Sequence, residues 1–275
     1  MIRVPSRARP FRTAARFTLL LALTGLVSSP ALAQDPSPEE IGLAIAYEAA
    51  ARNDGFGNFT ANLAMILRNR QGQESRRQIR FKVLEVEGDG DKSLFVFDQP
   101  RDVQGTALLT HGHLTAQDDQ WLYLPALKRV KRISSSTRTG SFMGSEFSYE
   151  DMSNPEVEKY TYRFLREEPC GDLICTVNEQ VPVDTKSSYS RQLVWQDKEH
   201  LRTWLVHYYD RKNSHLKTLV FAGYRQYLDR YWRAGEMTME NHLTGKSTVL
   251  NWTDLEFGTD LGDGDFSQAA LRRVR

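Results

Sequence analysis

Short alternating apolar segments recur through most of the chain and limit the folds that it can adopt. From residue 59 onward, about eleven segments rich in β-branched and aromatic residues follow one another at roughly ten-residue spacing. They cover residues 59–67, 77–87, 92–97, 120–125, 159–165, 175–183, 191–197, 201–209, 216–224, 236–243 and 247–257. Helices do not alternate with these segments, which excludes a doubly wound α/β fold. We predict one large antiparallel sheet, which with so many strands must curl or close into a barrel.

A single amphipathic helix of about four turns is expected before the strands. Ser37 is a suitable N-cap, and Pro38 fits the first helical position. Ile41, Ile45 and Ala49 form an apolar stripe, and a glycine-containing turn follows. The fold class is therefore mainly β with few helices.

Several of the expected strands are apolar on both faces, notably residues 92–97, 120–125 and 219–224. A sheet with one solvated face alternates apolar and polar side chains instead. The pattern favours a curved sheet whose concave face lines an apolar cavity or packs beneath a helix. The alternative is two sheets that share an ordinary core.

The first 33 residues have the pattern of a secretory signal peptide. Five arginines and no acid precede an apolar core of about a dozen residues, shorter than the roughly 20 residues of a membrane-spanning helix. Ala31 and Ala33 complete the cleavage pattern, so we predict a mature single domain of residues 34–275. The alternative is an uncleaved anchor helix. No cysteine near this point suggests a lipid anchor.

Charge and cysteine content constrain the partners and the compartment. Removing the five signal arginines leaves 31 basic and 35 acidic side chains, a net charge of −4, which argues against a nucleic-acid-binding protein. The two cysteines, Cys170 and Cys175, are predicted to form a structural disulfide, as expected for an exported protein. Their spacing does not match the C-x-x-C redox motif, and no further ligands at metal-site spacing accompany them.

No catalytic, cofactor or metal motif emerges from the chain. The segment 139–148 has serines near glycines but no G-x-S-x-G elbow and no P-loop ending. His111 and His113 share one side of a strand but lack a third ligand. Asp260, Asp263 and Asp265 do not complete a calcium loop, so a turn is expected there. A last short helix is predicted after it, capped at Asp265 or Ser267.

The segment 121–152 combines features that a simple hairpin does not need. Four cations, Lys128, Arg129, Lys131 and Arg132, follow a short apolar strand. A loop then carries large apolar side chains among glycines and serines: Phe142, Met143, Phe147 and Tyr149. The cations are interpreted as a strand at a barrel rim or as a solvated hairpin. The loop is expected to fold back over an apolar pocket.

The series "VQGTALLT", "WLYLPALKRVKRISSS" and "GSFMGSEFSYEDM" resembles the outer membrane lipoprotein-sorting protein family, a LolA-like group of exported proteins. The resemblance covers nearly the whole mature chain. It implies a half-open, strongly curved antiparallel β-barrel whose mouth is covered by a lid of helix and loops. It also implies a periplasmic carrier in a Gram-negative bacterium that binds acyl chains beside proton-driven exporters of the resistance-nodulation-division class. A periplasmic sensor of mislocalised lipoproteins is the alternative function.

On this reading the protein is a monomeric, non-enzymatic carrier without cofactor. The expected cavity lining is Leu63, Met65, Phe95, Phe97, Trp121, Tyr123, Trp195 and Trp204. The expected lid is Tyr47, Phe142, Met143 and Phe147, and the expected rim for headgroups or a transporter partner is Lys128, Arg129, Lys131 and Arg132.

Overall fold

The computed structural model describes residues 35–274, so the expected signal peptide lies outside the described residues. Helix α1 spans Pro38–Asn53, as the sequence predicts. Ser37 caps it with a complete capping box: its side chain accepts from the backbone of Glu40, and the Glu40 carboxylate accepts from the backbone of Ser37. None of the helices in this part of the chain is long and apolar enough to span a membrane.

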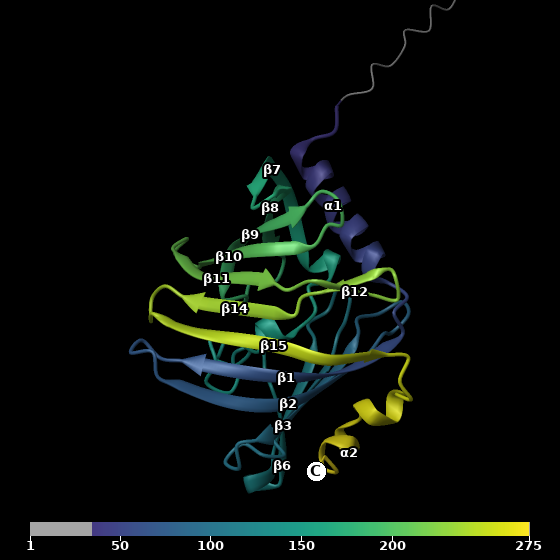
Figure 1. Ribbon diagram of the computed structural model, residues 1–275, viewed down its shortest axis with the longest axis vertical. Helices are drawn as coiled ribbons and strands as arrows, with labels where there is room; N and C mark the ends of the chain where they lie inside the picture. The colour runs from purple at the N-terminus through teal and green to yellow at the C-terminus, as the bar shows by residue number, and fades with distance from the viewer. Residues whose placement is uncertain (1–34, 275) are drawn as a thin grey trace, which may run out of the picture. The chain divides into compact units, whose positions relative to one another are not determined.

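Thirteen strands of the described chain form one antiparallel sheet (Figure 1). Its strands in chain order are β1 (Asn58–Arg68), β2 (Glu74–Leu84), β3 (Lys92–Gln99), β4 (Ala107–His111), β5 (Asp119–Leu124), β6 (Arg129–Arg132), β7 (Tyr160–Cys170), β8 (Leu173–Pro182), β9 (Tyr189–Asp197), β10 (Thr203–Asp210), β11 (His215–Ala222), β14 (Glu236–Asn241) and β15 (Lys246–Phe257). A separate hairpin joins β12 (Arg225–Tyr227) to β13 (Tyr231–Arg233).

The described sheet has thirteen strands, not the eleven expected. The β4 strand was not predicted, and β6 was one interpretation of the basic run that was not counted among the eleven. The β4 segment is short and buried on both faces, so it lacks the alternation that marks a strand. The β6 segment has only four residues, three of them cations.

The strand order explains where the longest irregular segment lies. The order is β6-β5-β4-β3-β2-β1-β15-β14-β11-β10-β9-β8-β7, so β6 and β7 are the two edges and the sheet does not close. These edges are consecutive in the chain, so the connecting residues 133–159 must cross from one edge to the other. They do so along the concave face, and Figure 1 shows the sheet curving around them. Two short 3-10 helices, Glu150–Met152 and Val157–Lys159, lie in this segment.

Each face of the sheet has its own core. The concave face carries the largest cluster, in which Leu63, Phe95, Val206 and Leu250 pack with side chains of the connecting segment. The convex face of β3–β6 is covered by the C-terminal residues, where Phe266 and the short helix α2 (Gln268–Leu271) seal a second cluster. Ser267 caps α2, one of the two predicted caps, and a 3-10 turn spans Asp263–Phe266.

The cysteines form the predicted disulfide, Cys170–Cys175, across the end of the β7–β8 hairpin. Cys175 is fully buried on the convex face beside Val177 and Trp195. The bridge therefore fastens the tip of the hairpin that forms one edge of the sheet.

Candidate functional site

A cavity of about 1530 Å³ lies between helix α1 and the concave face of the sheet. This is larger than the pockets of roughly 300–1,000 Å³ that hold ordinary small ligands. One wall is apolar and consists of side chains from strands β1–β3, β10, β11, β14 and β15. Its residues are Phe59, Phe81, Val83, Phe95, Val206, Leu219, Phe221, Met237, Leu250 and Trp252.

Helix α1 covers this cavity because small residues let it approach the sheet closely. Ala46, Ala49 and Ala50 line the cavity from the helix, and Ala46 packs with Val157 and Tyr162. Gly42 lies against β7, where a Cβ atom would come within 2.7 Å of the backbone nitrogen of Phe164.

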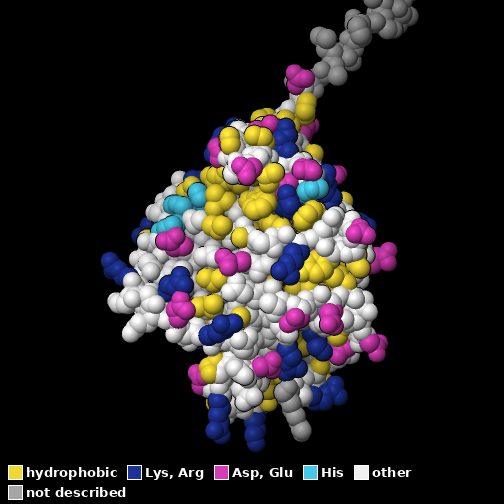
Figure 2. All heavy atoms as spheres, viewed as in Figure 1, with side chains coloured by type: hydrophobic (Ala, Val, Ile, Leu, Met, Phe, Trp, Pro, Cys, Tyr) yellow, Lys and Arg dark blue, Asp and Glu magenta, His cyan; other side chains and the backbone are white. Residues whose placement is uncertain are grey.

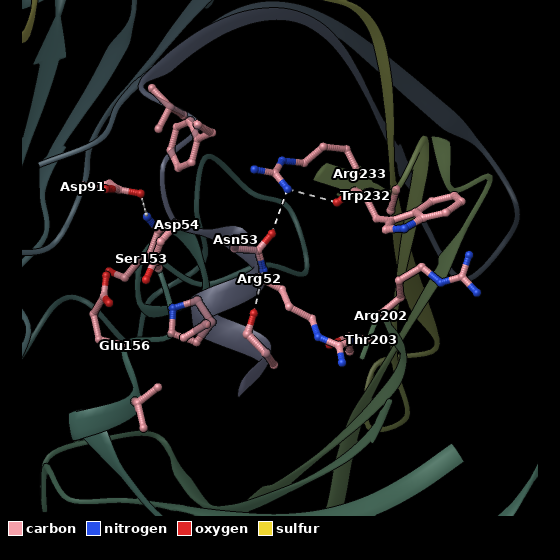
Figure 3. A pocket seen from close by; sticks show the side chains of 18 of the residues that line it. Arg52, Asn53, Asp54, Asp91, Ser153, Glu156, Arg202, Thr203, Trp232 and Arg233 are labelled. Atoms are coloured by element: carbon pink, nitrogen blue, oxygen red, sulfur yellow. Dashed lines mark hydrogen bonds between the residues drawn. The ribbon is translucent and has the colours of Figure 1, made fainter. Parts of the chain in front are cut away.

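The C-terminal end of α1 is fastened to the β12–β13 hairpin (Figure 3). The Arg233 guanidinium donates to the side-chain oxygen of Asn53 at 2.8 Å. The same guanidinium lies over four aromatic rings, with centroids 5.5–5.8 Å away. Burial lowers the pKa of Arg233. Arg230 and Tyr231 donate to backbone oxygens of the helix end and the turn after it. The C-terminal end of α1 is therefore held in place next to the cavity mouth.

Buried carboxyl groups stand at the mouth of the cavity. Burial raises the pKa of Asp91 to about 6 and that of Glu156 to about 7. Asn154 donates to Asp91 at 3.3 Å, and Figure 3 shows Asp91 and Glu156 on the same side of the cavity. The mouth therefore changes its charge near neutral pH.

The connecting segment 133–159 forms the floor of the cavity. Phe142 is completely buried and contacts Phe95, Phe97 and Tyr149, with ring centroids 5.6–5.9 Å apart. Phe147 is 1% exposed and lines the cavity. The backbone of this segment folds on itself, since Phe142 donates to the carbonyl of Phe147 at 2.7 Å.

A buried polar cluster ties this floor to the sheet. The Tyr189 hydroxyl donates to the Asp151 carboxylate at 2.8 Å, and the Lys217 ammonium lies 3.5 Å from that carboxylate and 3.2 Å from the hydroxyl. Arg138 bridges Glu150 and Asp184 at 3.3 and 3.0 Å. Removing one partner of such a buried pair is strongly destabilising. The floor is therefore anchored by charge as well as by aromatic packing.

The sequence-predicted cavity residues fall into three places. Phe95 lines the cavity. Leu63, Met65 and Phe97 belong to the same concave-face core, packed around the floor. The others lie elsewhere: Trp121 and Tyr123 pack against the C-terminal segment on the convex face, and Trp195 and Trp204 pack near the disulfide. The four residues come from three strands, β5, β9 and β10, and alternation along a strand does not reveal which of its faces turns inward.

The predicted lid and rim residues are also spread over the molecule. Phe142 and Phe147 were expected in a lid, but both are buried core residues of the floor. Arg77 donates to the carbonyl of Met143 beside them. Tyr47 lies on the outer side of α1, 49% exposed. The basic residues Lys128, Arg129, Lys131 and Arg132 lie on or beside edge strand β6, where Figure 2 shows basic side chains projecting at the lower end. Arg132 pairs with Asp119.

The residues weighed as metal ligands have structural contacts. His111 Nε2 lies 2.6 Å from the carbonyl oxygen of Phe266, and His113 pairs with Asp89 at 2.9 Å. Asp263 pairs with Lys92. Among residues 35–274, no group of three or more His, Cys, Asp or Glu is arranged to hold a metal ion.

Solved structures match this chain over most of its length. It is 56% identical to a structure described as an outer membrane lipoprotein-sorting protein domain from Vibrio parahaemolyticus, with a TM-score of 0.84, over 86% of this chain and 100% of that chain. A DUF1329 family protein from Desulfovibrio piger is 32% identical, with a TM-score of 0.81 and the same coverage. A LolA superfamily protein from Nitrosomonas europaea is 21% identical, with a TM-score of 0.66, over 83% of this chain and 98% of that chain, and is similar in fold.

A family model described as "-like: Uncharacterized protein" matches residues 89–273, and no curated protein matches the chain. The match to the Vibrio domain extends over all of that domain. This chain therefore belongs to the outer membrane lipoprotein-sorting protein family that its sequence resembles, and it shares the fold of the LolA superfamily protein.

Proposed function

We propose that this protein is a periplasmic carrier that holds the acyl part of a lipoprotein or lipid and moves it between the inner and outer membranes. The observation that carries this proposal is the large cavity under α1, with its apolar wall of strand side chains. Family membership supports it. Binding and release require no covalent chemistry.

The size of the apolar wall supports useful affinity. Burying about ten methylene groups contributes about 8 kcal/mol, at about 0.8 kcal/mol each. Loss of translational and rotational freedom offsets part of this. The net result is binding that a partner can reverse. Release then depends on opening α1 from the sheet, and the fastened end at Arg233 gives the helix a fixed point about which to move.

Partners of the carrier are proposed from charge. Val130 of edge strand β6 packs in the same convex-face cluster as Leu271 and Val274 of the C-terminal segment, and Figure 2 shows basic side chains projecting at this end. We assign it to contact with a donor or acceptor, including a transporter of the resistance-nodulation-division class. We expect the free carrier to be a monomer.

Two adjacent residues of β11 give a matched test of the cavity. Phe221 lines the cavity, whereas Val220 points to the other face and is 44% exposed. The protein as purified should release acyl lipids on extraction, identified by mass spectrometry, and should take up a fluorescent fatty acid. Phe221→Glu should abolish both because it places a charge in the apolar wall, and Val220→Glu should keep both. Equal behaviour of the two variants, or no lipid in the wild type and no uptake, would contradict the proposal.

A further inference from the structure

The cavity has a second wall that is polar, opposite in character to the apolar wall. One row of paired residues crosses four strands at the same level: Tyr162 on β7, Gln180 on β8, Gln192 on β9 and Tyr208 on β10. Paired residues of neighbouring strands point to the same face of a sheet. All four line the cavity. We call them the polar row.

The polar row is under-bonded in the described protein. Gln192 hydrogen-bonds the Tyr160 hydroxyl. Among residues 35–274, the Gln180 amide and the Tyr162 and Tyr208 hydroxyls have no side-chain hydrogen-bond partner. Tyr162 and Tyr208 are each 8% exposed. None of these atoms is among the fully buried unsatisfied atoms of the described residues, so they open onto the cavity and can hydrogen-bond a ligand there.

The neighbouring pair of the same strands repeats this feature. Asn178 on β8 is paired with Val194 and lies two residues from Gln180, on the same face. It is 1% exposed, and neither its amide oxygen nor its amide nitrogen has a hydrogen-bond partner in the described chain. Asn178 does not line the cavity, so this unsatisfied amide lies buried beside the polar row and is not part of it.

The charge around the cavity decides which polar group fits. Ten carboxylate side chains and only four arginines line it. Of these arginines, Arg52 is paired with Glu48, Arg202 is bound to Asp197, and Arg233 is bound to Asn53. An anionic group would meet net negative charge without a cation aimed at the row. Amides and hydroxyls both donate and accept, so they match an uncharged partner of the same kind.

We propose that the polar row binds the uncharged hydroxyl- or amide-bearing part of an amphiphile, such as a glyceryl ester or an N-acyl amide, while the acyl chain lies along the apolar wall. This rests on the proposed carrier function and names the class of cargo. The chemistry also fits the glyceryl and amide linkages through which acyl chains are joined to larger molecules. A free fatty acid, with a carboxylate in the same place, is the disfavoured ligand.

Competition between three ligands with the same chain tests this. N-phenylnaphthylamine, a neutral apolar fluorophore, serves as reporter, and 1-monooleoylglycerol, oleate and oleylamine displace it at pH 8. We expect monooleoylglycerol to bind about tenfold more tightly than oleate, as one or two hydrogen bonds allow. Gln180→Met keeps the side-chain volume and disturbs no bond of the fold. It should weaken monooleoylglycerol binding about twofold to tenfold and leave oleate and reporter binding unchanged.

Tyr208→Phe, which removes only a hydroxyl, should act in the same direction. Gln78→Met, on β2 outside the cavity lining, is the matched control and should change nothing. If oleate or oleylamine binds as tightly as monooleoylglycerol, or if Gln180→Met leaves the preference intact, the polar row assignment is wrong while reporter binding still supports a carrier. If neither the reporter nor any of the three ligands binds, the carrier function itself is overturned, and the polar row with it.

Discussion

Replacing Phe142 by alanine tests whether residues 133–159 are a structural floor or a movable gate. The ring is fully buried and contacts the rings of Phe95, Phe97 and Tyr149. Removing a buried phenylalanine ring costs about 3–5 kcal/mol through lost transfer energy and the cavity left behind. For a domain of this size, each kcal/mol lowers Tm by roughly 2–4 °C. We therefore expect Phe142→Ala to melt about 10 °C below the wild type.

Thermal unfolding followed by circular dichroism gives the comparison, with urea unfolding as an independent measure of the free energy of unfolding. Tyr47→Ala is the control, because this ring is 49% exposed on the outer side of α1 and should change stability by less than about 0.5 kcal/mol. A Phe142→Ala protein that melts within about 2 °C of the wild type but loses bound lipid faster would refute the floor, because such a ring would then belong to a gate.

Three further substitutions test the cavity mouth, the disulfide of the β7–β8 hairpin and helix α1. Glu156→Gln should match the wild type in stability below about pH 4 and exceed it by about 1 kcal/mol at pH 8. The reason is that the raised pKa of about 7 makes ionisation of the buried carboxyl unfavourable in the fold as pH rises; a difference that stays constant with pH would contradict this. Replacing Cys170 and Cys175 by serine should cost about 2 kcal/mol in urea unfolding, the low end expected for so short a loop, and no loss would be the contrary result. Gly42→Ala should cost about 1–3 kcal/mol and speed release of bound fluorescent fatty acid, because the added methyl meets the Phe164 backbone; an unchanged release rate would show that α1 does not cover the ligand.

Local patterns in the sequence predicted most of the secondary structure. The capping residue Ser37 and the period-two strands predicted α1 and eleven of the thirteen sheet strands, because caps and alternation are properties of neighbouring residues. Trp121 and Tyr123 were predicted to line the cavity but lie on the convex face of β5. Both faces of this strand are apolar, and the C-terminal residues that cover the convex face are distant in the sequence.

The position of the floor and the polar row could not be read from local patterns. Phe142 was expected in the lid. The strand order makes β6 and β7 opposite edges of the sheet, so the segment that connects them crosses the concave face and buries this ring. Gln180 and Gln192 resembled the solvated side of ordinary strands. They face a cavity because helix α1, more than 100 residues earlier in the chain, covers this part of the sheet.

Photo-crosslinking tests the central claim, that an acyl chain lies in the cavity under α1. Palmitic acid with a diazirine near its terminal methyl would be bound to the wild-type protein, irradiated, and the labelled side chains mapped by mass spectrometry. The account predicts labels on the apolar wall, on residues such as Phe81, Met237 and Leu250. Labels confined to the convex face, for example at Trp121, or to the exposed side of α1 would contradict it.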